Sequence, residues 1–240
     1  MPQPLQTVDA MTDQIRPAMP EQDRAKAFVA CGVLLLVFGF LALLARGEPG
    51  AWERALLLQF RDPANPARML GPRWLPEMLR DITSLGSTVV LGLVVAIVAS
   101  YLALGRKWAD LALVLAATLG GQVVSTTAKL LVARARPDLI PGAPMVFTPS
   151  FPSGHALLSA VTYLTLGALL SQIEPRRGMK IFYIGAAVAL TFVVGASRVA
   201  LGVHWPTDVL AGWSVGAAWA LLCGALAQRL RARRVLEPLV

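Results

Sequence analysis

The dominant pattern in the sequence is a set of long apolar stretches that contain no charged residue. Each is close to the roughly 17–25 residues that a helix needs to cross a bilayer. Hydrocarbon offers the backbone no hydrogen-bond partner, so such stretches are expected to be helices. The uncharged stretches are residues 27–45, 82–105, 111–128, 156–173, 181–197 and 209–228.

This pattern predicts an all-α integral membrane protein whose helices form one domain over residues 27–228. Some helices are expected to extend a few residues past the uncharged stretches, because polar residues tolerate the membrane interface. The six expected transmembrane helices cover about 27–45, 82–105, 111–132, 154–173, 180–198 and 207–228.

Polar segments flank this domain on both sides. Residues 1–26 form a proline-containing tail of mixed charge, and residues 229–240 form a basic tail. A cleaved signal peptide is the alternative interpretation of residues 27–45. That stretch is longer than the usual 7–15-residue apolar region of a signal peptide, and a long segment containing acidic residues precedes it. We therefore expect an uncleaved first helix.

The one long connection, residues 46–81, carries acidic and basic residues in nearly equal number. Within it, residues 51–60 and 74–79 have the pattern of short amphipathic helices. An ordinary surface loop is the alternative. The aromatic residues favour helices that lie in the membrane interface between the first two spans. These residues are Trp52, Phe60 and Trp74.

Composition supports a membrane protein and argues against a nucleic-acid partner. Hydrophobic residues make up 56% of the chain and charged residues only 15%, with a net charge of +8. A typical soluble domain has about 25% charged residues. The basic residues lie mainly at span ends, and no Lys/Arg run is interleaved with aromatic residues. Cys31 and Cys223 fall inside expected spans and suggest small buried residues.

The short loops predict the orientation. Basic residues follow spans two, four and six, at 106–107, 176–180 and 229–234. The positive-inside rule places these loops and both termini in the cytoplasm. The opposite side also carries basic residues, which belong to a suspected anion site. Strict alternation of the spans then brings four segment ends together there, around Lys129–Arg136, Ser153–His155, Arg198 and Asp208.

Each cluster has an ordinary interpretation and a functional one. Lys129 and Arg136 are about two helical turns apart and could face the same way, although basic residues at a span end commonly reach for headgroups. Ser153 is placed to cap the fourth span, and Gly154 allows close approach to its N-terminus, which can bind an anion. Simple capping, with His155 as an interfacial residue, is the alternative.

His204 and Asp208 are four residues apart, and a carboxylate can fix the tautomer of an imidazole and stabilise its protonated form. The other ring nitrogen would then be free to act as a nucleophile. Such a pair also arises by chance. A metal site could use His155, His204 and Asp208, but the basic residues nearby favour an oxyanion over a cation.

Taken together, the three clusters resemble the signature of the type 2 phosphatidic acid phosphatase family. That pattern is Lys-x6-Arg-Pro, then Pro-Ser-Gly-His, then Ser-Arg-x5-His-x3-Asp. The matching segments are Lys129 to Pro137, Pro152 to His155 and Ser197 to Asp208, with every signature position and spacing kept. The match covers residues 129–208, and the six spans with a long first connection also resemble membrane members of the family.

The resemblance implies a role for each residue. His204 would attack phosphorus and form a phosphohistidine, Asp208 would orient His204, and His155 would protonate the leaving oxygen and then activate water. The remaining signature residues would hold the phosphoryl oxygens without metal or cofactor: Lys129, Arg136, Ser153, Gly154 and Arg198.

The position of the suspected site at the ends of spans favours a lipid phosphate as substrate, because lipid headgroups lie at that level of the membrane. Bacterial relatives act on undecaprenyl diphosphate, phosphatidylglycerophosphate, phosphatidic acid or lipid A phosphates, so the expected partners are a lipid phosphate and membrane lipids. The expected location is the bacterial inner membrane, with the site on the periplasmic face. A phosphotransferase, a vanadium-dependent haloperoxidase and a non-catalytic lipid-binding protein remain alternatives. Arg134 and Asp138 could contact the headgroup or form surface salt bridges.

Overall fold

The computed structural model describes residues 21–141 and 147–232 and consists almost entirely of helices. The parts of the predicted tails at 1–20 and 233–240 lie outside the described residues. The elements, in chain order, are α1 (Glu21–Leu44), α2 (Ala51–Leu58), β1 (Arg61–Asp62), β2 (Asn65–Met69), α3 (Leu75–Ser84), α4 (Thr88–Leu104), α5 (Trp108–Val132), α6 (Gly154–Ile173), α7 (Arg177–Ala200) and α8 (Pro206–Ala232).

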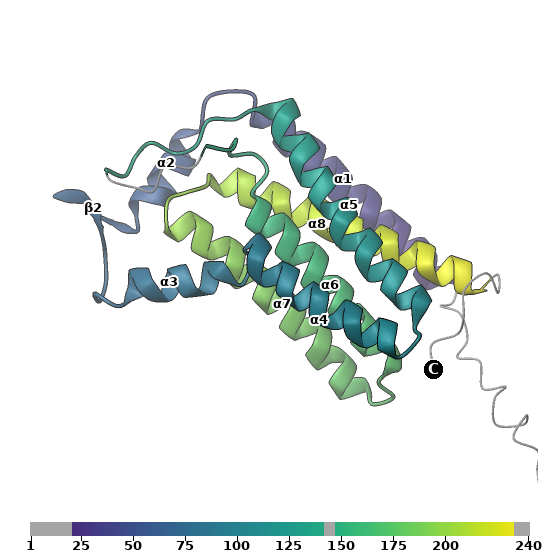
Figure 1. Ribbon diagram of the computed structural model, residues 1–240. Coiled ribbons are helices and arrows are strands. Elements are labelled where there is room, and N and C mark those ends of the chain that lie inside the picture. Colours follow the sequence, from purple (N-terminus) through teal and green to yellow (C-terminus); the bar gives the residue numbers. More distant parts are fainter. Residues whose placement is uncertain (1–20, 142–146, 233–240) are drawn as a thin grey trace, which may run out of the picture.

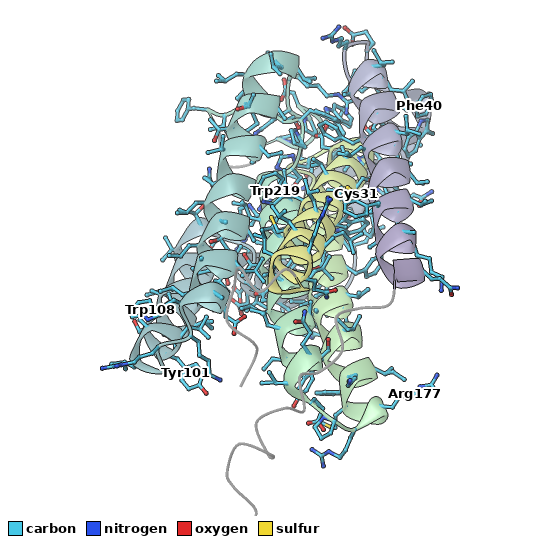
Figure 2. All side chains as sticks on the ribbon, turned by 90° about the vertical axis from the view of Figure 1, so that its right-hand side faces the viewer. Cys31, Phe40, Tyr101, Trp108, Arg177 and Trp219 are labelled. Carbon is cyan, nitrogen blue, oxygen red and sulfur yellow. The ribbon has the colours of Figure 1, made fainter. Side chains whose placement is uncertain are left out.

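The prediction of an all-α membrane bundle is confirmed. Within the described residues, five helices are long and apolar enough to span a bilayer, and a bent pair of helices brings the number to six. Large apolar side chains on the outer surface of these helices are exposed, as lipid-facing residues are, and Phe40 and Tyr101 are examples that point away from the bundle in Figure 2.

The second expected span is the bent pair. We expected one helix over 82–105, but α3 ends at Ser84 and α4 begins at Thr88, with a bend of 43° between them. Ser87 caps α4, because its Oγ accepts a hydrogen bond from the Val90 amide at 3.2 Å. The absence of charge across the break made two helices look like one.

Helix α6 lies at the centre of the bundle, between α5, α7 and α8, and α1 packs along α8 (Figure 1). Two glycines four residues apart let α8 approach α6 closely. A Cβ at Gly212 would lie 2.8 Å from the Ser153 carbonyl oxygen, and one at Gly216 would lie 2.6 Å from that of Leu157. This small-residue spacing is typical of tight helix pairs in membranes. It fixes the N-terminus of α6 against that of α8.

The long connection covers one end of the bundle, where α2, β2 and α3 gather at the left of Figure 1. Helix α2 begins at the expected residue and ends two residues earlier, and α3 runs five residues further than the expected helix at 74–79. The hairpin of β1 and β2 was not expected. Its buried Arg61 donates through Nη2 to the Ala200 carbonyl oxygen at 2.9 Å, which ties the hairpin to α7.

Candidate active site

Six of the eight predicted site residues line a single cavity of about 360 Å³ at the end of the bundle covered by the long connection. They come from α5 and the segment that follows it, from α6 and α7, and from the turn between α7 and α8. The other two lie in the protein wall behind it, where Asp208 and Ser153 are fully buried. The six lining residues are Lys129, Arg136, Gly154, His155, Arg198 and His204.

The turn between α7 and α8 positions His204. Helix α7 ends at Ala200, and Gly202 adopts a φ of +70°, which favours glycine. A Cβ there would also collide with Ile140 Cδ1. The chain turns back, and Pro206 begins α8, a position where its missing N–H costs nothing. His204 therefore lies between two fixed helix ends.

His204 and Asp208 face one another within the protein. The distance from His204 Nδ1 to Asp208 Oδ2 is 3.4 Å, longer than a good hydrogen bond, as is common in catalytic pairs without substrate. His204 Nε2 lies 3.0 Å from Arg136 Nη1. A guanidinium can only donate, so Nε2 accepts, and the ring proton is on Nδ1, towards Asp208. Nε2 therefore carries the lone pair that a nucleophile needs.

The surroundings favour the neutral imidazole. Burial lowers the pKa of His204 to about 3, with the positive charges of Arg198 and Arg136 acting in the same direction, while the Asp208 carboxylate opposes them. A neutral imidazole is the form that can attack an electrophile. Burial, assisted by the neighbouring cations, thus favours the neutral, nucleophilic form of His204 at neutral pH.

A buried polar network holds the Asp208 carboxylate. Its Oδ1 accepts from Arg134 Nη1 at 2.8 Å. Its Oδ2 accepts from the Trp205 amide at 2.9 Å and from the Ser150 hydroxyl. Charge and hydrogen bonds therefore fix the carboxylate on the side away from the cavity. Arg134 is buried and does not line the cavity, so of its two predicted roles the salt bridge is correct, within the protein rather than at its surface.

Glu53 of α2 completes this network. Arg134 Nη2 lies 2.9 Å from Glu53 Oε2, and Thr207 donates through Oγ1 to Glu53 Oε1 at 2.6 Å. Glu53 is only 3% exposed. Sequence reasoning missed Glu53, Ser150 and Thr207. The amphipathic pattern of α2 signalled a helix packed on one face, but nothing marked Glu53 as buried.

Backbone carbonyl oxygens orient two of the cations. Lys129 Nζ donates to the Pro149 carbonyl oxygen at 2.6 Å. Arg136 donates through Nε to the Thr148 carbonyl oxygen at 2.9 Å, and through Nη1 to that of Val203 at 2.9 Å. Burial lowers the pKa of Arg136, although a guanidinium stays charged at any ordinary pH. These contacts hold the cations beside His204 without neutralising them.

The opposite wall comes from α6 and α7. His155 lies in the first turn of α6, and Arg198, in the last turn of α7, donates through Nη1 to Thr83 Oγ1 at 3.2 Å. Ser153 occupies the N-cap position of α6, and its amide donates to the Asp208 carbonyl oxygen at 3.0 Å. The side-chain Oγ of Ser153 is buried and has no hydrogen-bond partner in the described part of the chain. The N–H groups of a helix's first turn lack partners within the helix, so this wall offers further donors to an anion.

The arrangement suits the chemistry of a phosphoryl group. Three cations surround a neutral imidazole whose Nε2 carries a lone pair, and a second imidazole lines the same cavity. Among the described residues, no group of three His, Cys, Asp or Glu side chains is placed to hold a metal ion. The charge of a phosphoryl group in transfer can be stabilised by fixed donors of this kind.

Comparison with known proteins agrees with this geometry. Over 147 residues the chain is 36% identical to phosphatidylglycerophosphatase B of Bacillus subtilis, covering 60% of this chain and 70% of the relative. It is 30% identical over 148 residues to decaprenylphosphoryl-5-phosphoribose phosphatase of Mycobacterium tuberculosis, covering 59% of this chain and 76% of the relative.

A solved structure is also similar. The transmembrane PAP2 type phosphatidylglycerolphosphate phosphatase from Bacillus subtilis superposes with a TM-score of 0.70 at 27% identity, covering 83% of this chain and 96% of that one. The profile of the PAP2 superfamily matches residues 107–232, which include all three signature segments. The chain therefore belongs to the PAP2 superfamily, as a membrane lipid phosphatase.

Proposed function

We propose that the protein hydrolyses a lipid phosphomonoester or diphosphate through a phosphohistidine on His204. The observation that carries this proposal is the orientation of the His204 ring. Nδ1 faces Asp208, while Nε2 accepts from Arg136 in a cavity that Lys129 and Arg198 also line. The nucleophilic lone pair therefore lies where a bound phosphoryl group would be held.

In the first step, the His204 Nε2 lone pair forms a bond to phosphorus while the bond from phosphorus to the lipid oxygen breaks. His155 donates a proton to that leaving oxygen. The bound anion favours the protonated form of His155 before the step. Asp208 stabilises the positive charge that develops on the His204 ring, through Nδ1.

In the second step, water attacks phosphorus and gives its proton to His155, which is neutral after the first step. The bond from phosphorus to Nε2 breaks, and inorganic phosphate is released. His204 and His155 return to their starting states, so the cycle consumes only lipid phosphate and water.

The hydrogen bond from Arg136 to Nε2 must yield before the attack, because it occupies the nucleophilic lone pair. Phosphate oxygens are stronger acceptors for a guanidinium than a neutral imidazole. We infer that the arriving phosphoryl group takes over this donor and frees His204. Arg136 then serves as both a cap on the resting nucleophile and a ligand of the bound substrate.

The cavity wall supports a lipid substrate. Gln122, Thr126 and Leu130 line the cavity and are exposed along one face of α5, four residues apart. A lipid could therefore reach the cavity from the bilayer. The names of the relatives make phosphatidylglycerophosphate the first candidate and a prenyl-linked phosphate the next. We further propose that the protein lies in the bacterial inner membrane, with the cavity on the periplasmic side.

The test is phosphate release by the purified full-length protein in detergent, with a chelator present throughout. Phosphatidylglycerophosphate, undecaprenyl diphosphate and phosphatidic acid are compared side by side. We expect release from at least one lipid, and we expect His204→Ala and His155→Ala each to remove nearly all turnover. Wild-type activity in His204→Ala would refute the mechanism.

The intermediate can be tested separately by trapping. With a lipid labelled with ³²P at the scissile phosphate, denatured wild-type protein should retain acid-labile label, and His204→Ala should retain none. If the wild-type protein retains label but releases phosphate from no lipid, the reaction is transfer of the phosphoryl group to an acceptor and not hydrolysis.

A further inference from the structure

A second cavity, of about 500 Å³, adjoins the candidate active site, and both are lined by Arg198. Its walls come from the hairpin of β1 and β2, one face of α3, the end of α7 and the turn between α7 and α8. We call it the arginine cavity. Its lining includes five arginines: Arg61, Arg68, Arg73, Arg80 and Arg198.

In the described part of the chain, the charges of these arginines are not balanced by a carboxylate. Within the residues that the structure describes, no Asp or Glu lines the arginine cavity. In the same part of the chain, none of its five guanidinium groups forms an ion pair with a carboxylate. Five like charges around one space repel each other unless an anion enters. The cavity is therefore electrostatically suited to an anionic ligand.

Two of these arginines have a buried Nε that finds no hydrogen-bond partner in the described part of the chain. Arg61 is 7% exposed and donates through Nη2 to the Ala200 carbonyl oxygen, but its Nε has no partner in the described part of the chain. The Nε of Arg198 is likewise buried and unpaired there. A buried donor without a partner is costly, so both groups are built into the wall at some expense to stability. An anion in the cavity could relieve that cost.

Helix α3 turns one face towards the arginine cavity. Pro76, Arg80 and Thr83 line it and are spaced four and three residues apart, which places them on the same side of the helix. The acidic residues of α3, Glu77 and Asp81, are exposed and do not line the cavity. Thr83 accepts the hydrogen bond from Arg198, so this face of α3 continues into the active-site wall.

We propose that the arginine cavity binds a phosphate group. This inference rests on the proposed function, because hydrolysis of a lipid phosphate provides the two possible sources of the bound phosphate group. One source is the inorganic phosphate released by hydrolysis, passing Arg198 on its way out. The other is a second phosphate in the headgroup of the substrate, held while the first is cleaved. Both are oxyanions that several arginines bind through charge-assisted hydrogen bonds.

The binding test uses inorganic phosphate and needs no turnover. Binding of ³²P-labelled phosphate to purified full-length protein is measured by equilibrium dialysis. We expect two sites in the wild type and one in Arg73→Gln/Arg80→Gln, whose exposed side chains can be replaced without disturbing the core. Arg46→Gln, which removes one positive charge at an exposed position just after α1, should keep both sites. Two sites of wild-type affinity in Arg73→Gln/Arg80→Gln would overturn the proposal.

The kinetic test distinguishes the two sources. If free phosphate uses the cavity, Arg73→Gln/Arg80→Gln should weaken inhibition by inorganic phosphate about tenfold and leave kcat/KM for lipids unchanged. If the headgroup uses it, kcat/KM should fall about tenfold for phosphatidylglycerophosphate and undecaprenyl diphosphate, but not for phosphatidic acid, which has one phosphate. No difference from Arg46→Gln in either measurement would count against the cavity.

The outcomes also separate this proposal from the proposed function. Wild-type protein that binds two phosphates but releases none from any lipid would leave the arginine cavity standing and refute the hydrolysis. Wild-type protein that releases phosphate from a lipid but has a single phosphate-binding site would support the hydrolysis and refute the arginine cavity.

Discussion

Arg134 Nη1 lies 2.8 Å from Asp208 Oδ1, although 74 positions separate the two residues in the chain. Both side chains are almost completely buried. The other guanidinium nitrogen, Nη2, contacts Glu53 of α2. One cation thus links the carboxylate behind His204 to the long connection outside the bundle. The position of the proposed nucleophile therefore depends on Arg134, which lies within the first signature segment at a position that the signature leaves open.

Arg134→Gln is expected to destabilise the protein by about 3–5 kcal/mol, because it leaves the buried carboxylates of Glu53 and Asp208 without their cation. Thermal and denaturant unfolding in detergent measures the loss. Arg54→Gln is the matched control, since Arg54 is partly exposed and lies 3.8 Å from the exposed Glu48. A surface pair of this kind is worth about 0–1 kcal/mol. Equal stability losses in the two variants would contradict the role of Arg134.

Asp208→Asn is expected to lower kcat by about 10³–10⁴-fold and to leave a measurable remainder. The amide removes the charge that stabilises protonated His204, while the nucleophile itself is retained. Initial rates on the preferred lipid provide the measurement. Asp138→Asn is the control, because that exposed carboxylate follows the first signature segment and does not line the active-site cavity. A comparable loss in Asp138→Asn would mean that net charge, rather than orientation of His204, sets the rate.

The sequence was sufficient to place the cavity residues because alternation of spans decides which helix ends meet. Lys129, His155 and Arg198 are far apart in the chain, yet each lies at the end of an apolar stretch, and His204 follows Arg198 by six residues. Four helix ends on the same side of one bundle must lie close together. The local pattern of apolar stretches therefore predicted contacts between residues far apart in the chain, which such a pattern rarely does in soluble proteins.

The buried network behind His204 could not be predicted in this way. Glu53 lies among charges of both signs in the long connection, and Ser150 lies in a loop between prolines. Their roles depend on tertiary contacts across 154 and 58 positions, respectively. The bend between α3 and α4 left a local signal, since Gly86 and Ser87 are suited to a helix break and a cap. Uniform hydrophobicity outweighed that signal.

Gly216→Ala is expected to destabilise the protein, whereas Gly224→Ala on the same helix should stabilise it. A Cβ at Gly216 would lie 2.6 Å from the Leu157 carbonyl oxygen, so α6 and α8 must move apart. A Cβ at Gly224 meets nothing within 4 Å, and alanine favours the helix by about 1 kcal/mol over glycine. Midpoints of thermal unfolding in detergent should therefore shift in opposite directions. Shifts of the same sign would show that helix propensity, rather than close approach, controls both positions.

The stability of the protein is expected to decrease in acid partly because of His204. Burial lowers the pKa of His204 to about 3 in the folded protein, whereas its ordinary value in an unfolded chain is 6.5. Below pH 6.5 the unfolded chain takes up a proton that the folded protein does not, so acid favours unfolding. This contribution is fully present above pH 6.5 and is lost as the pH falls towards 3. Between about pH 7 and pH 5 the loss is about 2 kcal/mol.

His204→Gln provides the comparison, because glutamine does not titrate and other groups contribute equally to both proteins. Unfolding free energies in detergent at several pH values should give a steeper acid dependence for the wild type. The difference between the two proteins should change by up to about 1.4 kcal/mol per pH unit in this range. Parallel dependences would mean that burial does not lower the pKa of His204 in the folded protein. That result would contradict the claim that the surroundings of His204 favour its neutral form.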